Sequence, residues 1–228
     1  IEETGKLTES LKNEIEAADT LQQVEDLYLP YKKRKKTRAD KAREKGLQPV
    51  AEFLTTTRKM DSVYLQKFLD SEKELETEDD VLHGAMDILA EDIANTIPVR
   101  NFLREQLKKR GVIVSEKVEE AQDEKQVYKD YYEFQQRVRF LPPYRVLAMN
   151  RGERENVLKI KVELENPPLH VIARIMEWKT YLAYFDILEK TIQDSFSRLL
   201  FPSIEREIRS QLKEEAELRA IEVFTKNL

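Results

Sequence analysis

Apolar residues recur every three or four positions through most of the chain, which is the spacing of one face of an α-helix. The repeat begins with Leu7, Leu11, Ile15 and Ala18 and returns in one segment after another. It therefore predicts a chain made mainly of amphipathic helices. The predicted helical segments are 8–18, 20–29, 37–46, 49–57, 62–75, 81–97, 98–111, 120–141, 173–200 and 202–228.

Local signals place several helix ends. Thr37 with Asp40, and Thr77 with Asp80, have the spacing of a capping box. Gly46 stands where a helix would end in a left-handed residue. We therefore expect a short helix between Thr37 and Gly46 and a longer one after Thr77.

One region departs from the helical period. Leu158, Ile160, Val162 and Leu164 alternate with polar residues, and a polar turn, 151–156, precedes them. Together with the apolar stretch in 144–150, this pattern predicts a β-hairpin near 145–164. Pro167 and Pro168 would separate it from the helical tail.

These elements predict an all-α fold: an elongated multi-helix assembly with one small β-hairpin and a long C-terminal helix. Helices 81–97 and 98–111 are joined tightly, as in a helix-turn-helix, although any pair of antiparallel helices has the same spacing. The expected organisation is a helical segment 1–76, a candidate helix-turn-helix region 77–143, the hairpin and proline linker 144–168, and long helices 169–228.

Composition agrees with helices and excludes much chemistry. The chain has 228 residues, 36% of them charged, with only five Gly and no Cys, so disulfides, thiolate nucleophiles and zinc fingers are excluded. His83 and His170 have no partner at metal-ligand spacing, and no phosphate loop or nucleophile motif occurs. We expect no enzymatic activity, no cofactor, no metal and no small-molecule substrate.

The lack of Cys and of any long apolar run favours a cytoplasmic protein without a membrane segment. The chain does not begin with Met, and its last predicted helix is still regular at Leu228. We therefore expect it to be part of a longer polypeptide.

A basic run is the strongest departure in charge. Nine Lys or Arg residues lie between Lys32 and Lys45, in a chain of net charge −5. Clustered cations of this kind contact phosphate, whereas long helical faces usually mix both signs. A solvated face, or an internal contact to an acidic region, stays open as the alternative. The predicted nucleic-acid contacts are Lys32, Lys33, Arg34, Lys35, Lys36, Arg38, Lys41 and Arg43.

Two stretches carry a family resemblance. The segment EDLYLPYKKRKKTRADKAREKGLQPVAEFL, which begins at Glu25, resembles the signature of the bacterial transcription accessory protein Tex family. FLPPYRVLAMNRGERENVLKIKVE, from Phe140, is similar to a second stretch of that family, and the tail LKEEAELRAIEVFTKNL is similar to its helix that leads into the next domain. The family usually has Pro where this chain has Lys33.

The resemblance implies a multidomain cytoplasmic protein that binds nucleic acid and is linked to transcription. It implies a helical region with a helix-turn-helix element, an RNase H-like domain, helix-hairpin-helix motifs and an OB-fold RNA-binding domain. This chain would be the helical region before the RNase H-like domain. Its expected partners are the RNA or DNA backbone, mainly through the other domains, and RNA polymerase or the ribosome. The alternative is a protein-docking scaffold for that machinery without direct nucleic-acid binding.

Overall fold

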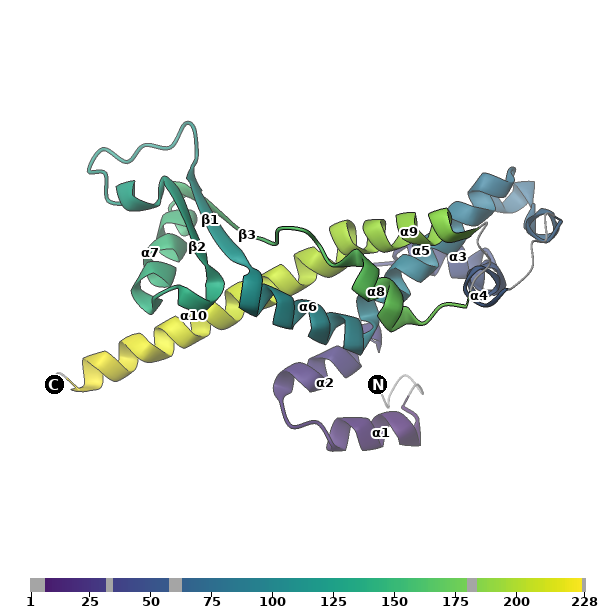
Figure 1. The fold of residues 1–228 in the computed structure, drawn as a ribbon, viewed down its shortest axis with the longest axis horizontal. Helices are drawn as coiled ribbons and strands as arrows, with labels where there is room; N and C mark the ends of the chain where they lie inside the picture. Colours follow the sequence, from purple (N-terminus) through teal and green to yellow (C-terminus); the bar gives the residue numbers. More distant parts are fainter. Residues whose placement is uncertain (1–6, 32–34, 58–62, 180–183, 227–228) are drawn as a thin grey trace. The chain divides into compact units, whose positions relative to one another are not determined.

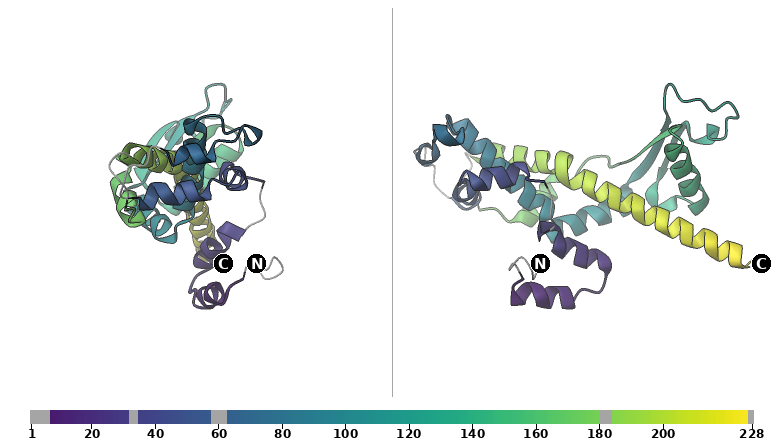
Figure 2. Two further views of the ribbon diagram at one scale, coloured as in Figure 1. Left: turned by 90° about the vertical axis from the view of Figure 1, so that its right-hand side faces the viewer. Right: turned by 180° about the vertical axis from the view of Figure 1, so that it is seen from behind.

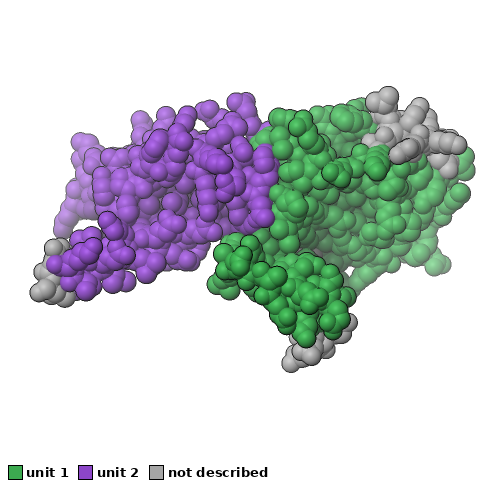
Figure 3. Space-filling model, turned by 60° about the horizontal axis from the view of Figure 1, so that its bottom comes forward, with its two compact units in different colours: residues 1–100, 168–200 green, residues 101–167, 201–228 purple. Residues whose placement is uncertain are grey.

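The computed structural model describes residues 7–31, 35–57, 63–179 and 184–226, and the protein is mainly α-helical (Figure 1), which confirms the predicted class. The chain divides into two compact units: unit 1 comprises residues 1–100 and 168–200, and unit 2 comprises residues 101–167 and 201–228 (Figure 3). The helices of unit 1 are α1 (Glu9–Glu16), α2 (Leu21–Tyr28), α3 (Arg38–Glu44), α4 (Gln48–Thr56), α5 (Glu78–Asn95), α8 (Leu169–Met176), α9 (Phe185–Asp194) and a π-helical segment (Ser195–Leu200).

Unit 1 is built around α5, which contacts α3, α4, α9 and the π-helical segment. Ala85 and Ile88 on α5 are fully buried, as are Val50 and Leu54 on α4. At the other end of α5, Ser195 donates a 2.6 Å hydrogen bond to the Ala90 carbonyl. α3, which carries part of the basic run, packs on this helix through its buried residues Ala39 and Ala42.

Both predicted capping boxes are confirmed. Thr37 accepts a hydrogen bond from the Asp40 amide and donates its own amide to the Asp40 carboxylate, and Thr77 and Asp80 do the same at the start of α5. Gly46 has φ +88° and ends α3. Its amide bonds to the Arg43 carbonyl, and the next amide bonds to the Ala42 carbonyl, which is the Schellman arrangement.

Unit 2 contains a three-stranded antiparallel sheet in the order β2-β1-β3 (Figures 1 and 2), formed by β1 (Val112–Lys117), β2 (Glu133–Arg137) and β3 (Leu158–Glu163). Its helices are α7 (Pro143–Arg154), α10 (Phe201–Lys226) and the part of α6 (Ile97–Arg110) that follows Arg100. Ile113, Ile160 and Val162 form the buried side of the sheet. α7 and α10 contact each other and β3.

Four predicted elements are wrong. The predicted helix 173–200 is divided, because α8 ends at Met176 before the left-handed residue Glu177, and α9 begins at Phe185. Residues 143–154 form α7, so the hairpin near 145–164 does not form and β3 pairs with β1 instead. The predicted helix 120–141 contains two 3-10 turns and β2, because residues 133–137 pair with β1. Of the predicted helix 62–75, residues 63–75 contain only short 3-10 turns around Leu65–Phe68 and Ser71–Lys73.

Candidate nucleic-acid interface

The described part of the predicted nucleic-acid contacts lies in unit 1, before and on α3. Lys35, Lys36, Arg38 and Lys41 are exposed, whereas Arg43 is half-buried. The three remaining predicted contacts, Lys32, Lys33 and Arg34, lie outside the described residues. The structure therefore separates four cations at the surface from a fifth that faces the interior.

Arg43 forms an internal brace between α3 and α5. Its Nη1 lies 2.7 Å from Glu91 Oε2, its Nη2 lies 2.8 Å from Asp92 Oδ1, and its Nε donates to Gln48 Oε1 at 3.3 Å. Burial alone would lower the pKa of Arg43, but the hydrogen bond that it donates to Glu91 and the charges of both carboxylates outweigh burial and raise that pKa. With its donors so engaged, Arg43 fits the internal contact that the sequence left open.

Burial also raises the pKa of Asp92, the charge of Arg43 opposes this shift, and the charge of Glu91 adds to it. When folding raises the pKa of a carboxyl, the protonated group favours the folded state at low pH. This contribution to stability falls as the pH rises from about 4 through the folded pKa. Arg43 limits this fall, because it attracts Asp92 and Glu91 only while they are ionised.

We expect Arg43→Gln to lower the free energy of unfolding by about 1–3 kcal/mol at pH 7, since the charged hydrogen bonds to Glu91 and Asp92 are lost. The loss should shrink toward pH 3, because Asp92, whose pKa burial raises, is then largely protonated and no longer attracts the guanidinium. Urea unfolding at the two pH values measures it. A loss of the same size at both pH values would contradict an electrostatic brace.

The exposed cations are held weakly. Lys36 Nζ lies 2.7 Å from Glu44 Oε1, but both side chains are more than half exposed, so water and salt screen the pair. Burial raises the pKa of Asp87. The charge of Arg198 and, to a smaller extent, the charge of Arg38 oppose this rise. Lys35 and Lys41 have no ion pair within the described residues. All four side chains can therefore reach a phosphate without breaking a buried contact.

Two arginines of the candidate helix-turn-helix, Arg100 and Arg104, are buried in internal ion pairs and so are not offered to DNA. Arg100, which is 2% exposed, pairs with Asp26 in unit 1 at 2.9 Å. Arg104, which is 6% exposed, pairs with Glu207 in unit 2 at 2.8 Å. Only Lys108, Lys109 and Arg110 of that helix's basic residues stay at the surface.

A second basic surface, which none of the predicted contacts includes, lies in unit 2. Here α7 and α10 form a groove of about 520 Å³. The groove is lined by five basic residues and two carboxylates: Arg151, Arg154, Arg206, Arg209, Lys213, Glu153 and Glu217. Along α10 these cations alternate with acidic residues, so only the packing of α7 on α10 gathers them.

Within the described ranges, no three His, Asp or Glu side chains lie close enough together to hold a metal ion. Among the helices that the structure describes, none is long and apolar enough to cross a membrane.

Comparison with known proteins assigns the family. Residues 58–224 match the family model described as Tex central region-like. The chain belongs to the Tex family. All of the chain aligns with the protein YdcI of Bacillus subtilis at 41% identity, with the transcriptional accessory protein Tex of Neisseria gonorrhoeae at 35%, and with the human S1 RNA-binding domain-containing protein 1 at 29%.

The chain spans 32%, 31% and 24% of the length of these three relatives. It therefore corresponds to about a third of a bacterial Tex-family protein. The first signature stretch, which runs from Glu25 to Leu54, lies entirely before the matched central region and contains the basic run.

Proposed function

We propose that this chain is a non-enzymatic helical part of a cytoplasmic nucleic-acid-binding transcription accessory protein, and that its basic run contacts the phosphate backbone. The observation that carries the proposal is the exposure of Lys35, Lys36, Arg38 and Lys41 around the start of α3. Lys32, Lys33 and Arg34 would extend the same contact. The names of the relatives support it, since one is a transcriptional accessory protein and another has an S1 RNA-binding domain. Other domains of the longer protein would supply most of the affinity.

The fold gives this surface its position. α3 is capped at both ends, and two buried alanines, Ala39 and Ala42, face the rest of unit 1. Arg38 and Lys41 are exposed, and the Arg43 brace holds α3 on α5. The backbone that carries Arg38 and Lys41 would thus already be ordered. Binding a phosphate backbone there would cost little further conformational entropy of the main chain.

The test is the salt dependence of binding to a duplex. Each phosphate contact contributes about 0.9 to the slope of log affinity against log salt. Replacing Lys35, Lys36, Arg38 and Lys41 with Gln should therefore reduce the slope by about 3 to 4. Fluorescence anisotropy over a range of salt concentrations measures it.

A matched control removes three Lys and one Arg from other exposed positions of unit 1: Lys12, Lys67, Lys190 and Arg174, each to Gln. Both variants lower the net charge by four, so a slope that falls equally in both would show a general charge effect and refute the proposed contact. Arg43→Gln should leave the slope unchanged.

One observation favours the second candidate, a docking scaffold for RNA polymerase or the ribosome. Leu218, Ile221 and Phe224 are 64%, 62% and 67% exposed and follow one another at three-residue spacing on α10. Apolar side chains so placed are typical of protein interfaces. Retention of the purified machinery after nuclease digestion, with no salt-dependent binding to nucleic acid, would favour this function over the first.

A further inference from the structure

Unit 2 carries a cluster of aromatic and arginine side chains, here called the aromatic–arginine patch: Phe134, Arg139, Phe140, Tyr144 and Arg145. The Arg139 guanidinium carbon lies 4.5 Å from the centre of the Phe140 ring. The Arg145 guanidinium carbon lies 5.1 Å from the ring centre of Phe134 and 5.9 Å from that of Tyr144. The side chains come from β2, the turn after it and the first turn of α7.

The two outer rings of the patch face solvent. Phe140 is 60% exposed and Tyr144 is 64% exposed, although aromatic side chains supply much of the apolar area that cores and interfaces bury. Phe134, in contrast, is half-buried on the side of the sheet that carries Ser115. The patch therefore combines a half-buried ring, Phe134, with two exposed rings, Phe140 and Tyr144, each of which has an arginine beside it.

The arginines of the patch are held by rings and amides rather than by carboxylates. Arg145 donates to Gln136 Oε1 at 2.9 Å, and Gln136 in turn donates to the Phe140 carbonyl at 2.9 Å. Elsewhere in unit 2, Arg151 pairs with Glu155 and Arg209 pairs with Glu153. The patch thus keeps its positive charge available for an anion while its geometry is fixed.

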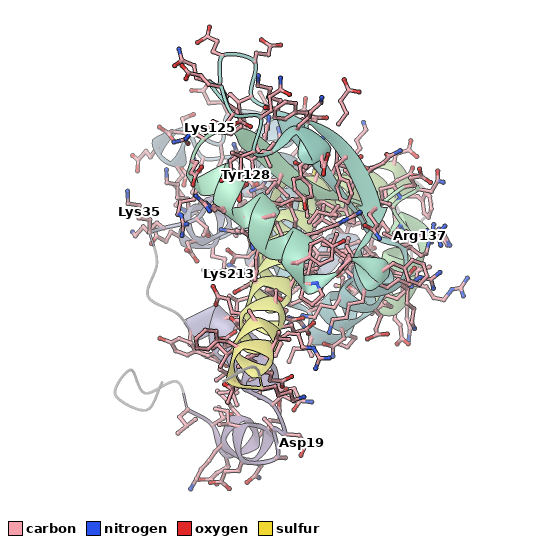
Figure 4. The ribbon with its side chains drawn as sticks, turned by 90° about the vertical axis from the view of Figure 1, so that its left-hand side faces the viewer. Asp19, Lys35, Lys125, Tyr128, Arg137 and Lys213 are labelled. Carbon is pink, nitrogen blue, oxygen red and sulfur yellow. The ribbon has the colours of Figure 1, made fainter. Side chains whose placement is uncertain are left out.

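The exposed side of α7 leads from the patch to the basic groove. Tyr144 and Arg151 are seven residues apart, which places them on one side of the helix about 10 Å from each other. Leu147, between them, lines the groove. Figure 4 looks onto α7, with the labelled Lys213 on α10 beside it.

Three cations of the groove are loosely engaged. Arg154 has no ion pair within the part of the chain that the structure describes, Arg206 donates only to the Pro202 carbonyl at 3.0 Å, and Lys213 lies 3.8 Å from Glu217. All three are exposed. Glu153, the other carboxylate of the groove, forms an ion pair with Arg209.

We propose that unit 2 binds an unpaired segment of nucleic acid, with bases stacked on Phe140 and Tyr144 and phosphates held by Arg154, Arg206 and Lys213. This inference rests on the proposed function, in that the chain must bind nucleic acid, but it concerns a different surface from the basic run. Free aromatic faces beside cations are the features that bind single strands with little sequence preference. A duplex hides its base faces, and an acidic peptide would use the cations without requiring the rings.

The test compares three ligands with equal numbers of phosphates: a single-stranded oligouridylate, the same strand without bases, and a duplex. In Phe140→Leu/Tyr144→Leu, affinity for the oligouridylate should fall at least tenfold, since each stacked base contributes about 1–3 kcal/mol. Affinity for the abasic strand and the duplex should stay unchanged. Leucine preserves the apolar character of both exposed sites, and Phe185→Leu, at another exposed Phe, is the matched control.

A second variant tests the groove. Replacing Arg154, Arg206 and Lys213 with Gln should reduce the salt slope for the single strand by about 2, because each contact to a single strand contributes about 0.7. An unchanged slope would remove the groove from the proposal.

The inference is overturned if the double Leu variant binds the oligouridylate as tightly as the unchanged chain, or if all three ligands weaken together. Binding of polyglutamate that depends on Phe140 and Tyr144, without any preference for the strand with bases, would show an acidic protein to be the occupant. If the basic-run variant has no effect but the double Leu variant does, the proposed phosphate contact fails and this site stands. If the unchanged chain binds none of the three ligands at low salt, both fail.

Discussion

Arg100→Met is expected to lower the free energy of unfolding by about 3–5 kcal/mol, the largest effect that we predict for a single charged residue. Asp26 and Arg100 are 3% and 2% exposed, and Arg100 Nε lies 2.9 Å from Asp26 Oδ1. Arg100 Nη1 also donates to the Ala94 carbonyl at 3.2 Å. Without the guanidinium, the Asp26 carboxylate stays buried but loses the charge and the hydrogen bond of Arg100, so its desolvation is less well offset.

The double variant Asp26→Leu/Arg100→Met should recover most of that loss. A buried ion pair replaced as a whole by apolar side chains of similar size is often neutral, whereas half of a pair is costly. Urea unfolding at pH 7 measures both, with Arg174→Met, at an exposed position, as a control expected within about 0.5 kcal/mol of the unchanged protein. A double variant as unstable as Arg100→Met would contradict this account of the pair.

Leu47→Ala is expected to cost about 2–5 kcal/mol, since Leu47 is fully buried and its removal leaves a cavity. The side chain lies against Gly84 in the middle of α5, where an added Cβ would meet Leu47 Cδ1 at 2.2 Å. The two positions are therefore coupled: the absence of a side chain at Gly84 makes the space that Leu47 fills.

That coupling predicts a change of sign. In the Leu47→Ala background, Gly84→Ala should raise stability by about 1–2 kcal/mol, through the higher helix propensity of alanine and the buried methyl group. In the unchanged protein, Gly84→Ala also brings the higher helix propensity of alanine, but the new methyl group displaces Leu47. The substitution should therefore not raise stability there. Thermal unfolding of the four variants tests this, and an equal effect of Gly84→Ala in both backgrounds would refute it.

Local signals predicted the helix ends well. Thr37 with Asp40, Thr77 with Asp80, and Gly46 act through contacts within a few residues, so the sequence contains all that is needed to identify them. Around α7 the local signals conflict. Pro143 indicates the end of the preceding predicted helix, but proline also suits the first turn of a helix, and Leu147, Ala148 and Met149 are good helix formers.

The sheet was harder to predict because strands are decided by partners far along the chain. Tyr131, Phe134 and Val138 fit a helical spacing, and they are also residue types that favour strands. The register that pairs Phe134 with Ser115, and Ser115 with Ile160, selects the strand. No local pattern specifies that pairing.

The same limit applies to the candidate site. The sequence presented nine cations between Lys32 and Lys45 as one run, and it could not show that Arg43 would meet Glu91 and Asp92, 48 and 49 residues away. Nor could it show that α7 and α10 would bring Arg154 next to Arg206 and Lys213. The charges were visible, but their division between internal and external roles depends on the tertiary fold.

The most direct test of the central proposal is the affinity of this chain for a nucleic-acid duplex, measured from low to physiological salt beside a full-length Tex-family protein. We predict that the chain binds at low salt, more weakly than the longer protein, with log affinity falling linearly as log salt rises. Absence of binding at the lowest salt, or an affinity independent of salt, would contradict a direct phosphate contact and leave the docking scaffold as the function of this region.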